Sequence, residues 1–199
     1  MGNATHGTEI LLGAQNCSAH APGAYTGQVL IESLKQLSCS YCIIGHAEVQ
    51  QLCPENAQVL AAKAIRLIEN GICPILCIGE SAQDYELSRG SKKLDELLIP
   101  FFEILHNADL QQKKLCIAYE PLWAINSNST PTPDYIAKQL EHIKTLHLHS
   151  IPELVCLKLY GGGVDETNTR EFKNIDALDG FLIGRASTDF QKLQKIVEL

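Results

Sequence analysis

Residues 55–80 read ENAQVLAAKAIRLIENGICPILCIGE and join two different hydrophobic patterns. In Glu55–Asn70 the apolar residues recur at helical spacing, and Gly71 follows where a helix C-cap favours glycine. These apolar positions are Leu60, Ala61, Ala64, Ile65 and Ile68. Ile75–Ile78 is instead a continuous apolar run, which is typical of a strand buried on both faces of a parallel sheet. The stretch therefore predicts an amphipathic helix that leads into a buried strand.

The same alternation extends in both directions along the chain. A second amphipathic segment, Pro133–Leu146, begins behind Thr132, which is a favourable helix N-cap. Six short apolar runs are strand candidates: Ile10–Ala14, Tyr41–Ile44, Ile75–Ile78, Leu115–Tyr119, Leu154–Leu159 and Phe181–Ile183. No linker or change of composition interrupts them, so we expect one α/β domain over residues 1–199. In such folds the ligand site lies at the carboxyl ends of the strands.

Composition and charge limit the possible functions. The 199 residues are 45% hydrophobic and 20% charged, which excludes a disordered chain. The formal net charge of −7 is opposite in sign to that of most nucleic-acid-binding proteins. No apolar run reaches the roughly eighteen residues of a membrane helix, and Met1–Thr8 does not have the layout of a secretion signal. We therefore expect a soluble, cytoplasmic protein that binds neither nucleic acid nor a membrane.

The eight cysteines fall mostly within apolar runs, where a free cysteine behaves as a small core residue. Cys39 and Cys42 have the CxxC spacing of some zinc and redox sites. In a strand, however, positions three apart point to opposite faces, and no second CxxC completes a site. We expect core cysteines and no metal. The alternative, a cysteine-based metal module, predicts stoichiometric zinc.

Two polar side chains follow strand candidates. His46 stands two residues past Tyr41–Ile44, and Glu120 directly follows Leu115–Tyr119. A carboxylate is costly to bury at the end of an apolar strand unless it has a function there. Desolvation raises the pKa of a carboxylate, so Glu120 is a candidate general base near neutral pH. For His46 the alternative is an ordinary structural histidine.

The segment after Glu120 has the composition of a lid. Pro121 ends the strand, Leu122–Ile125 is apolar, and Asn126–Ser129 is small and polar. An apolar tip between a proline and a polar hinge suits a loop that closes over a site and excludes water. The alternative is a loop that packs on a neighbouring element through Trp123.

Two further strand ends are rich in glycine, Tyr160–Gly163 and Ile183–Ser187. Such turns expose backbone N–H groups, and the second turn precedes a candidate short helix whose N-terminus would attract an anion. Glycine also serves ordinary tight turns. Beside a carboxylate and a histidine, the two turns indicate a phosphorylated substrate.

Seven short motifs resemble those of the triosephosphate isomerase family, in the same order and spacing over essentially the whole chain. They are Gly13–Asn16, Gly23–Gly27, Ile44–Glu48, Cys77–Glu80, Ala118–Ile125, Tyr160–Gly162 and Gly180–Gly184. The resemblance implies a TIM (β/α)8 barrel that interconverts dihydroxyacetone phosphate and glyceraldehyde 3-phosphate in glycolysis and gluconeogenesis. It implies no metal or cofactor. It also implies a homodimer in which loop Asn16–Gly27 of one subunit enters the other.

The resemblance assigns roles to individual residues. Glu120 would move a proton between neighbouring carbons, and His46 would polarise the carbonyl as a neutral imidazole. The phosphate-binding residues would be Asn126, Gly163, Gly184 and Arg185. The lid would be Pro121, Leu122, Trp123, Ala124, Ile125, Asn126, Ser127 and Asn128. The supporting residues would be Glu48, Glu80, Tyr160 and Leu182. Glu80 would be a partner of Trp123, and Ile125 and Leu182 would press on Glu120.

The sequence departs from the family pattern in several places. It contains no Asn-x-Lys motif, which in the family carries a catalytic lysine on the first strand. It begins near the family's third strand, so we expect about six βα units, with the first two strands missing. Asn126–Asn128 replaces the lid's Gly-Thr-Gly, and Gly163 and Arg185 replace a serine and a glycine of the phosphate loops. Lys158 has the strand parity of Tyr160, and we expect it to face a helix and extend outward.

Two functions remain open from the sequence. The first is a triose-phosphate isomerase whose full activity needs the first strands, and the second is an impaired paralogue that binds phosphate ligands or partners. Six strands cannot close a barrel, so the strands beginning at Ile10 and Phe181 would be exposed edges. A misassigned or removed N-terminus, a completing partner chain or a decaying gene copy would each explain this, and we favour an incomplete chain.

Overall fold

The computed structural model describes residues 7–125 and 129–198, which contain a six-stranded sheet. The strands are β1 (Gly13–Ala14), β2 (Tyr41–Ile44), β3 (Cys73–Ile78), β4 (Lys114–Tyr119), β5 (Val155–Tyr160) and β6 (Gly180–Phe181). They lie side by side in chain order, and every neighbouring pair is parallel. Parallel neighbours in chain order need a crossover after each strand, which is the βα arrangement that the sequence predicts.

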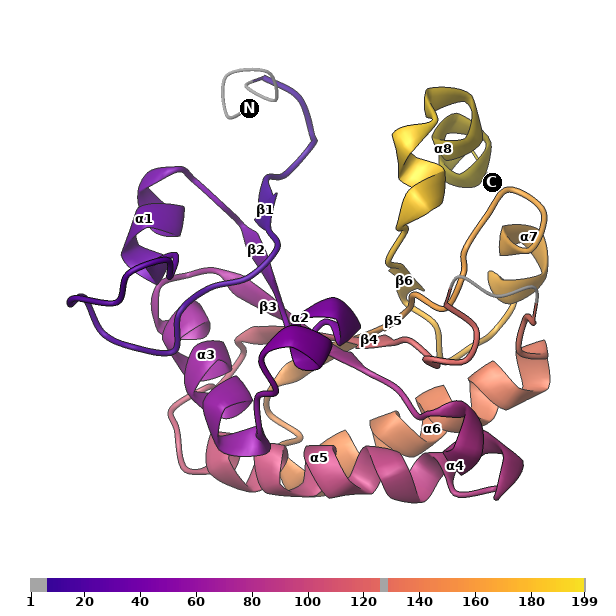
Figure 1. Ribbon diagram of the computed structural model, residues 1–199, viewed down its shortest axis with the longest axis horizontal. Coiled ribbons are helices and arrows are strands. Elements are labelled where there is room, and N and C mark those ends of the chain that lie inside the picture. The colour runs from indigo at the N-terminus through magenta and orange to yellow at the C-terminus, as the bar shows by residue number, and fades with distance from the viewer. Residues whose placement is uncertain (1–6, 126–128, 199) are drawn as a thin grey trace.

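Helices connect and flank the strands. They are α1 (Ile31–Gln36), α2 (Ala47–Leu52), α3 (Ala57–Glu69), α4 (Ala82–Glu86), α5 (Gly90–His106), α6 (Pro133–Ser150), α7 (Thr169–Phe172) and α8 (Phe190–Val197), with the 3-10 helix η1 (Arg185–Thr188). Figure 1 shows the sheet curling from β1 to β6 as an open barrel wall, with α3, α5 and α6 along its outside. The described residues thus form a partial α/β barrel, as the sequence predicts.

The core lies between the sheet and helices α3, α5 and α6. Leu67 of α3, Phe101 of α5, Ile117 of β4 and Ile143 of α6 are all fully buried. Burying one such side chain contributes about 1.5–3 kcal/mol to stability. Thr132 caps α6 as predicted, because its side chain accepts a hydrogen bond from the backbone N–H of Tyr135, the third residue of the helix.

The element boundaries differ from the predicted ones mainly at the sheet edges. Of the predicted strand Ile10–Ala14, only the last two residues form a strand, β1. The predicted strand Phe181–Ile183 is shorter than expected and begins one residue earlier, as the two-residue β6. In the described chain each of these strands has one neighbour, so little backbone is held in a ladder, and Ile10 remains 67% exposed. Helix α6 continues four residues beyond Leu146 because the buried His147 ring bonds the Leu154 carbonyl and completes the inner face.

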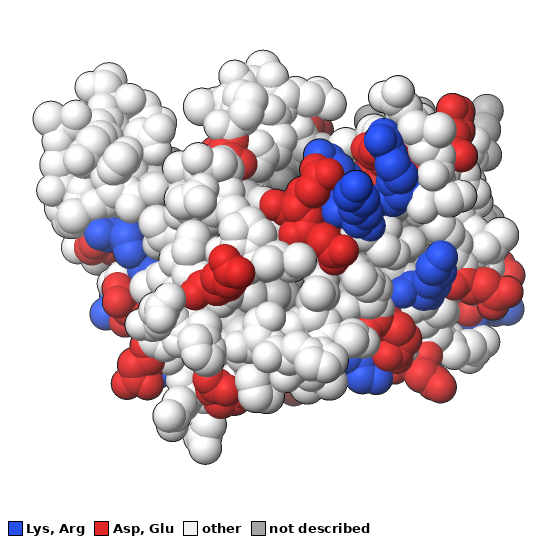
Figure 2. Space-filling view, turned by 90° about the horizontal axis from the view of Figure 1, so that it is seen from below, with Lys and Arg blue, Asp and Glu red and all other residues white. Residues whose placement is uncertain are grey.

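Six cysteines are buried as predicted, namely Cys17, Cys39, Cys42, Cys77, Cys116 and Cys156, and all eight are free thiols. The prediction is wrong for Cys53, which is exposed because it follows the last turn of α2, and Cys73 is only half-buried. The described residues hold no group of three potential metal ligands. Within the same ranges, no helix has both the length and the apolar character of a membrane span. On the face seen in Figure 2, acidic and basic side chains are interspersed rather than separated by sign.

Candidate active site

His46 is fixed at the start of α2, where the chain leaves β2. Its Nδ1 accepts a hydrogen bond from the backbone N–H of Glu48 at 3.3 Å, which makes His46 the N-cap of α2. A ring nitrogen that accepts carries no proton, so the neutral tautomer has its proton on Nε2. Gly45 allows this turn because its φ is +70°, and a β-carbon there would press on Leu76 and on the Cys77 carbonyl.

Glu120 is a buried carboxylate at the end of β4. Its backbone N–H donates to the Ile78 carbonyl at 2.7 Å, and the residue is 4% exposed. The Oε2 atom is buried and has no hydrogen-bond partner in the described part of the chain. Burial raises the pKa of Glu120 to about 7; the Cys77 thiol, which bonds the carboxylate, opposes this shift, and the negative charge of Glu48 adds to it. An ionised Glu120 is therefore a base matched to neutral pH.

The two side chains face each other across a short gap. The distance from His46 Nε2 to Glu120 Oε2 is 3.8 Å. This is longer than a hydrogen bond, so neither group satisfies the other. The pair presents an unpartnered basic oxygen and an N–H donor side by side, which is what proton abstraction next to a polarised carbonyl requires.

Two glycines make room for Glu120. A β-carbon at Gly79 would collide with the Glu120 carbonyl group, and one at Gly161 would lie 2.7 Å from Glu120 Oε1. Gly161 therefore lets the carboxylate reach its position, whereas the sequence suggests only a phosphate turn for this segment. Both glycines directly follow strands, which is the sequence signal for this close approach.

A second buried carboxylate anchors the start of the candidate lid. Glu80 is fully buried, and its Oε1 accepts hydrogen bonds from Trp123 Nε1 at 2.8 Å and from the Tyr135 hydroxyl at 3.2 Å. The Tyr119 hydroxyl donates to the same carboxylate at 3.0 Å. The Trp123 ring also stacks on Tyr85 at a centroid distance of 4.1 Å. The predicted Glu80–Trp123 contact is present, and Trp123 packs on α4 as the alternative interpretation of the loop requires.

Sequence reasoning missed Tyr85 and Tyr135. Tyr85 lies on α4, and Tyr135 lies in the first turn of α6. The only sequence signal for them is that both are aromatic residues near helix ends.

The described part of the lid is a tight turn. Leu122 N–H donates to the Glu80 carbonyl, and Ala124 N–H donates to the Pro121 carbonyl. Ala124 is buried, Leu122 is 43% exposed and Ile125 is half-buried. The predicted lid and phosphate residues Asn126, Ser127 and Asn128 lie outside the described residues.

The remaining phosphate candidates lie at two turns. Gly163 has a φ of +81°, and its N–H donates to the Gly161 carbonyl. Gly184 and Arg185 are exposed at the start of η1, whose Ser187 donates back to the Gly184 carbonyl. The N–H of Gly163 is thus already used within its own turn.

The supporting candidates are spread around the pair. Tyr160 is fully buried, its hydroxyl donates to the Gly162 carbonyl, and its own carbonyl accepts from the N–H of the half-buried Leu182. The Glu48 side chain is 85% exposed, with Oε2 3.9 Å from His46 Nδ1.

Lys158 does not extend outward as predicted. Its side chain is 14% exposed, and its Nζ lies 2.7 Å from Asp179 Oδ2. The same Nζ donates to the Cys156 carbonyl. The ion pair is available because Asp179 directly precedes β6, the neighbour of β5.

Comparison of the amino-acid sequence with known proteins matches the chain to one family. The sequence model of a family described as triosephosphate isomerase matches residues 1–199. Proteins named triosephosphate isomerase include one from Hahella chejuensis, 35% identical over 95% of this chain and 75% of its own length. Another, from Dichelobacter nodosus, is 39% identical over 94% of this chain and 77% of its own. A third, from Aquifex aeolicus, is 34% identical over 98% and 79%, respectively. The chain belongs to the triosephosphate isomerase family.

Proposed function

We propose that this chain interconverts dihydroxyacetone phosphate and D-glyceraldehyde 3-phosphate by proton transfer through an enediolate. The observation that carries the proposal is the 3.8 Å separation of His46 Nε2 and Glu120 Oε2 at the carboxyl ends of β2 and β4. Membership of the family supports the same reaction. In this proposal residues 1–199 act as one partial-barrel domain.

Glu120 is the proposed base. Its ionised carboxylate takes the proton from the carbon next to the substrate carbonyl and returns it to the neighbouring carbon. A pKa of about 7 leaves a large ionised fraction near neutral pH and still allows the carboxyl group to hold the proton between the two steps. Burial without a hydrogen-bond partner for Oε2 keeps that oxygen basic.

His46 is the proposed electrophile. Because Nδ1 accepts the Glu48 N–H, the proton on Nε2 is available to the substrate carbonyl oxygen. As the carbonyl carbon becomes part of the enediolate, its oxygen gains charge, and a fixed N–H donor stabilises that charge more than the ground state. His46 would then shuttle a proton between the two oxygens.

The candidate lid and phosphate turns complete the proposed site. We assign lid closure to Pro121–Asn128, which would exclude water and protect the enediolate from losing its phosphate. The substrate phosphate would lie against the N–H groups of Gly184 and Arg185, with Gly163 and Asn126 beside it.

The positive charge of this site differs from the family pattern, because the chain contains no Asn-x-Lys motif. Two partly or fully buried lysines near the strands do not replace it: Lys63 pairs with Glu55, and Lys158 pairs with Asp179. Less cationic charge stabilises the enediolate less. We therefore expect turnover below that of family members that carry the motif.

We also propose a homodimer that works in glycolysis and gluconeogenesis in the cytoplasm. The loop Asn16–Gly27 extends beyond α1 at one end of the molecule (Figure 1), and its Tyr25 is 42% exposed and stacks on His20. Exposed aromatic surface of this kind is enriched in interfaces. Free thiols at all eight cysteines suit a reducing compartment.

The decisive experiment is a coupled assay of the purified chain with glyceraldehyde 3-phosphate, together with the Glu120→Gln variant. Turnover by the wild-type chain that falls about 10³-fold in the variant is expected, because a general base contributes about 10²–10⁴-fold. A chain that binds a phosphate ligand without turnover would contradict the proposal and favour a binding scaffold. Turnover that survives Glu120→Gln would contradict the assignment of the base.

A further inference from the structure

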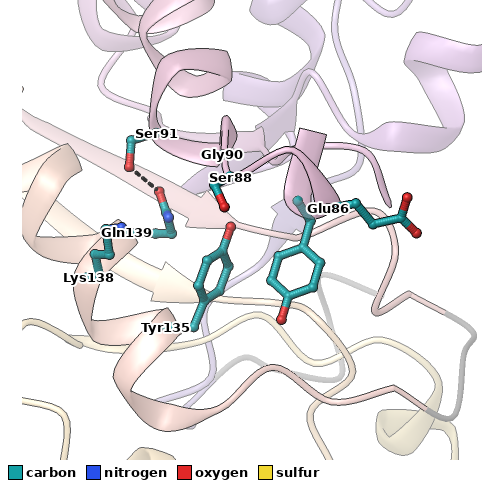
Figure 3. A pocket seen from close by; sticks show the side chains of 8 residues that line it. Glu86, Ser88, Gly90, Ser91, Tyr135, Lys138 and Gln139 are labelled. Carbon is teal, nitrogen blue, oxygen red and sulfur yellow. Dashed lines mark hydrogen bonds between the residues drawn. The ribbon is translucent and has the colours of Figure 1, made fainter. Parts of the chain in front are cut away.

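Tyr135 lies in the first turn of α6 and lines a cavity of about 430 Å³ between α4, α5 and α6. Its side chain projects toward Ser88 and Gly90, at the start of α5 (Figure 3). A β-carbon on Gly90 would collide with the Tyr135 hydroxyl and would lie 3.6 Å from Glu80 Cγ. Gly90 therefore leaves room for this hydroxyl to reach the Glu80 carboxylate, a contact that has no role in the proposed reaction.

Glu80 Oε1 accepts hydrogen bonds from two different parts of the chain. Trp123, which belongs to the candidate lid, donates its Nε1–H at 2.8 Å, and Tyr135 donates its hydroxyl at 3.2 Å. The Tyr119 hydroxyl lies 3.0 Å from both carboxylate oxygens and has one proton to donate. Burial and the charge of Glu80 raise the pKa of Tyr135, so its hydroxyl keeps the donated proton at neutral pH.

A buried carboxylate makes the loss of any donor costly. Glu80 is fully buried, so water does not replace a donor that leaves it. When Trp123 moves away, Oε1 keeps the Tyr135 hydroxyl, and this hydrogen bond reduces the cost of the movement. Without that hydroxyl, Oε1 would depend on the proton that Tyr119 shares between the two oxygens. Tyr135 thus makes the hydrogen bond between Trp123 and Glu80 easier to break.

The position of Trp123 leaves the candidate site open to water. The indole stacks on Tyr85 while it is bonded to Glu80, and with the lid in this position the His46 side chain is 30% exposed. A lid that excludes water from the pair of His46 and Glu120 has to leave this position. Trp123 then has to leave Glu80, and the cost of that step enters the free energy of closing the lid.

We propose that Tyr135 is a positioning residue that makes lid closure easier, because its hydroxyl stays on Glu80 when Trp123 leaves. The inference rests on the proposed function, in which a phosphorylated substrate is covered by the lid. Tyr135 acts only through Glu80 and Trp123, so its effect requires the tryptophan. Removal of the hydroxyl therefore weakens the binding of ligands that close the lid, and it leaves the pKa of Glu120 unchanged.

The first test measures KM for glyceraldehyde 3-phosphate in a double-mutant cycle. Tyr135→Phe keeps the ring that packs edge-on against Tyr85 at 5.0 Å and removes only the hydroxyl. KM should rise about five- to tenfold, the factor that one hydrogen bond contributes, while kcat/KM still decreases below about pH 7. In the Trp123→Phe background the same exchange should change KM less than about twofold, because the lid then has no hydrogen bond to Glu80 to break.

The second test follows the fluorescence of Trp123, the single tryptophan, during a titration with glycerol 3-phosphate. This unreactive analogue of the substrate carries the phosphate but no carbonyl group. The fluorescence change that reports the release of Trp123 should need about five- to tenfold more analogue in Tyr135→Phe than in the wild type. Tyr41→Phe is the matched control and should titrate like the wild type, because Tyr41 lies at the start of β2, at the opposite end from His46.

The contrary results separate this proposal from the proposed reaction. An equal rise of KM with and without Trp123 would overturn the role of Tyr135, because the hydroxyl would then act by another route. Equal titration midpoints in the wild type and Tyr135→Phe, or a wild-type fluorescence that does not change, would also overturn it. A chain that does not turn over glyceraldehyde 3-phosphate but shows the shifted midpoint would refute the proposed reaction and leave the coupling of Tyr135 to Trp123 standing.

Discussion

Replacing the Glu120 carboxylate by an amide should make the protein more stable at pH 8 while it removes the proposed base. Burial raises the pKa of Glu120 from 4.5 to about 7, and Oε2 has no hydrogen-bond partner within the described ranges. One pKa unit corresponds to about 1.4 kcal/mol, so the ionised carboxylate destabilises the folded chain by about 3 kcal/mol above pH 7. The uncharged Glu120→Gln side chain avoids this cost and can still accept the Cys77 thiol.

The sign of the pH dependence follows from the raised pKa. Between about pH 4.5 and 7 the folded protein holds the Glu120 proton while the unfolded chain has lost it. The wild-type free energy of unfolding therefore contains a contribution that falls as the pH rises through this window and levels off above it. Glu120→Gln has no such contribution, so its advantage grows from near zero at pH 4.5 to about 3 kcal/mol at pH 8.

Urea denaturation of wild-type and variant proteins between pH 4.5 and 8.5 measures this difference. Glu103→Gln is the control, because Glu103 is an exposed carboxylate on α5 and should change stability by less than about 0.5 kcal/mol. A Glu120→Gln protein that is no more stable than wild type at pH 8 would refute the desolvation argument. A gain that is the same at every pH would show that packing, and not ionisation, is responsible.

Three further predictions test the surroundings of the pair. Gly161→Ala should lower kcat about 10²-fold with the fold retained by circular dichroism, because its β-carbon would displace Glu120 Oε1; unchanged kcat would contradict this. Trp123→Phe keeps an aromatic ring on Tyr85 but loses the hydrogen bond to Glu80. The free energy of unfolding, measured by urea denaturation, should therefore fall by about 2 kcal/mol, and an unchanged value would show that the hydrogen bond contributes nothing. The kcat/KM of the wild-type chain should decrease as the pH drops below about 7, because Glu120 becomes protonated. Cys77→Ala should move this decrease to higher pH, since the thiol lowers the Glu120 pKa, and a shift to lower pH would refute that role of Cys77.

The sequence predicts the central strands well because their signal is burial. β2 matches the predicted Tyr41–Ile44, and β3 and β4 contain the predicted runs with small extensions. At the edges the same apolar signal fails, because pairing on one side holds only two residues in β1 and in β6. Hydrophobicity marks what can be buried, and it does not report whether a neighbouring strand is there to pair.

The candidate site is predictable where one residue at a strand end carries the chemistry. Position after a buried strand identifies Glu120 and His46, and the structure gives the distance between them. The cluster around Glu80 is harder to foresee, because Tyr85 and Tyr135 come from helices and meet the carboxylate only through packing. Lys158 illustrates the same limit, since its partner Asp179 is 21 residues away in the chain.

The two halves of the candidate site depend on different parts of the sheet. His46 follows β2 and Glu120 follows β4, and both strands border β3, so three adjacent central strands set the geometry of the pair. Gly184 and Arg185 follow β6, an edge strand that is held to β5 by two residue pairs. The proposed base and electrophile are therefore positioned by the well-packed core, whereas the turn proposed to hold the phosphate follows a strand that has one neighbour in the described residues.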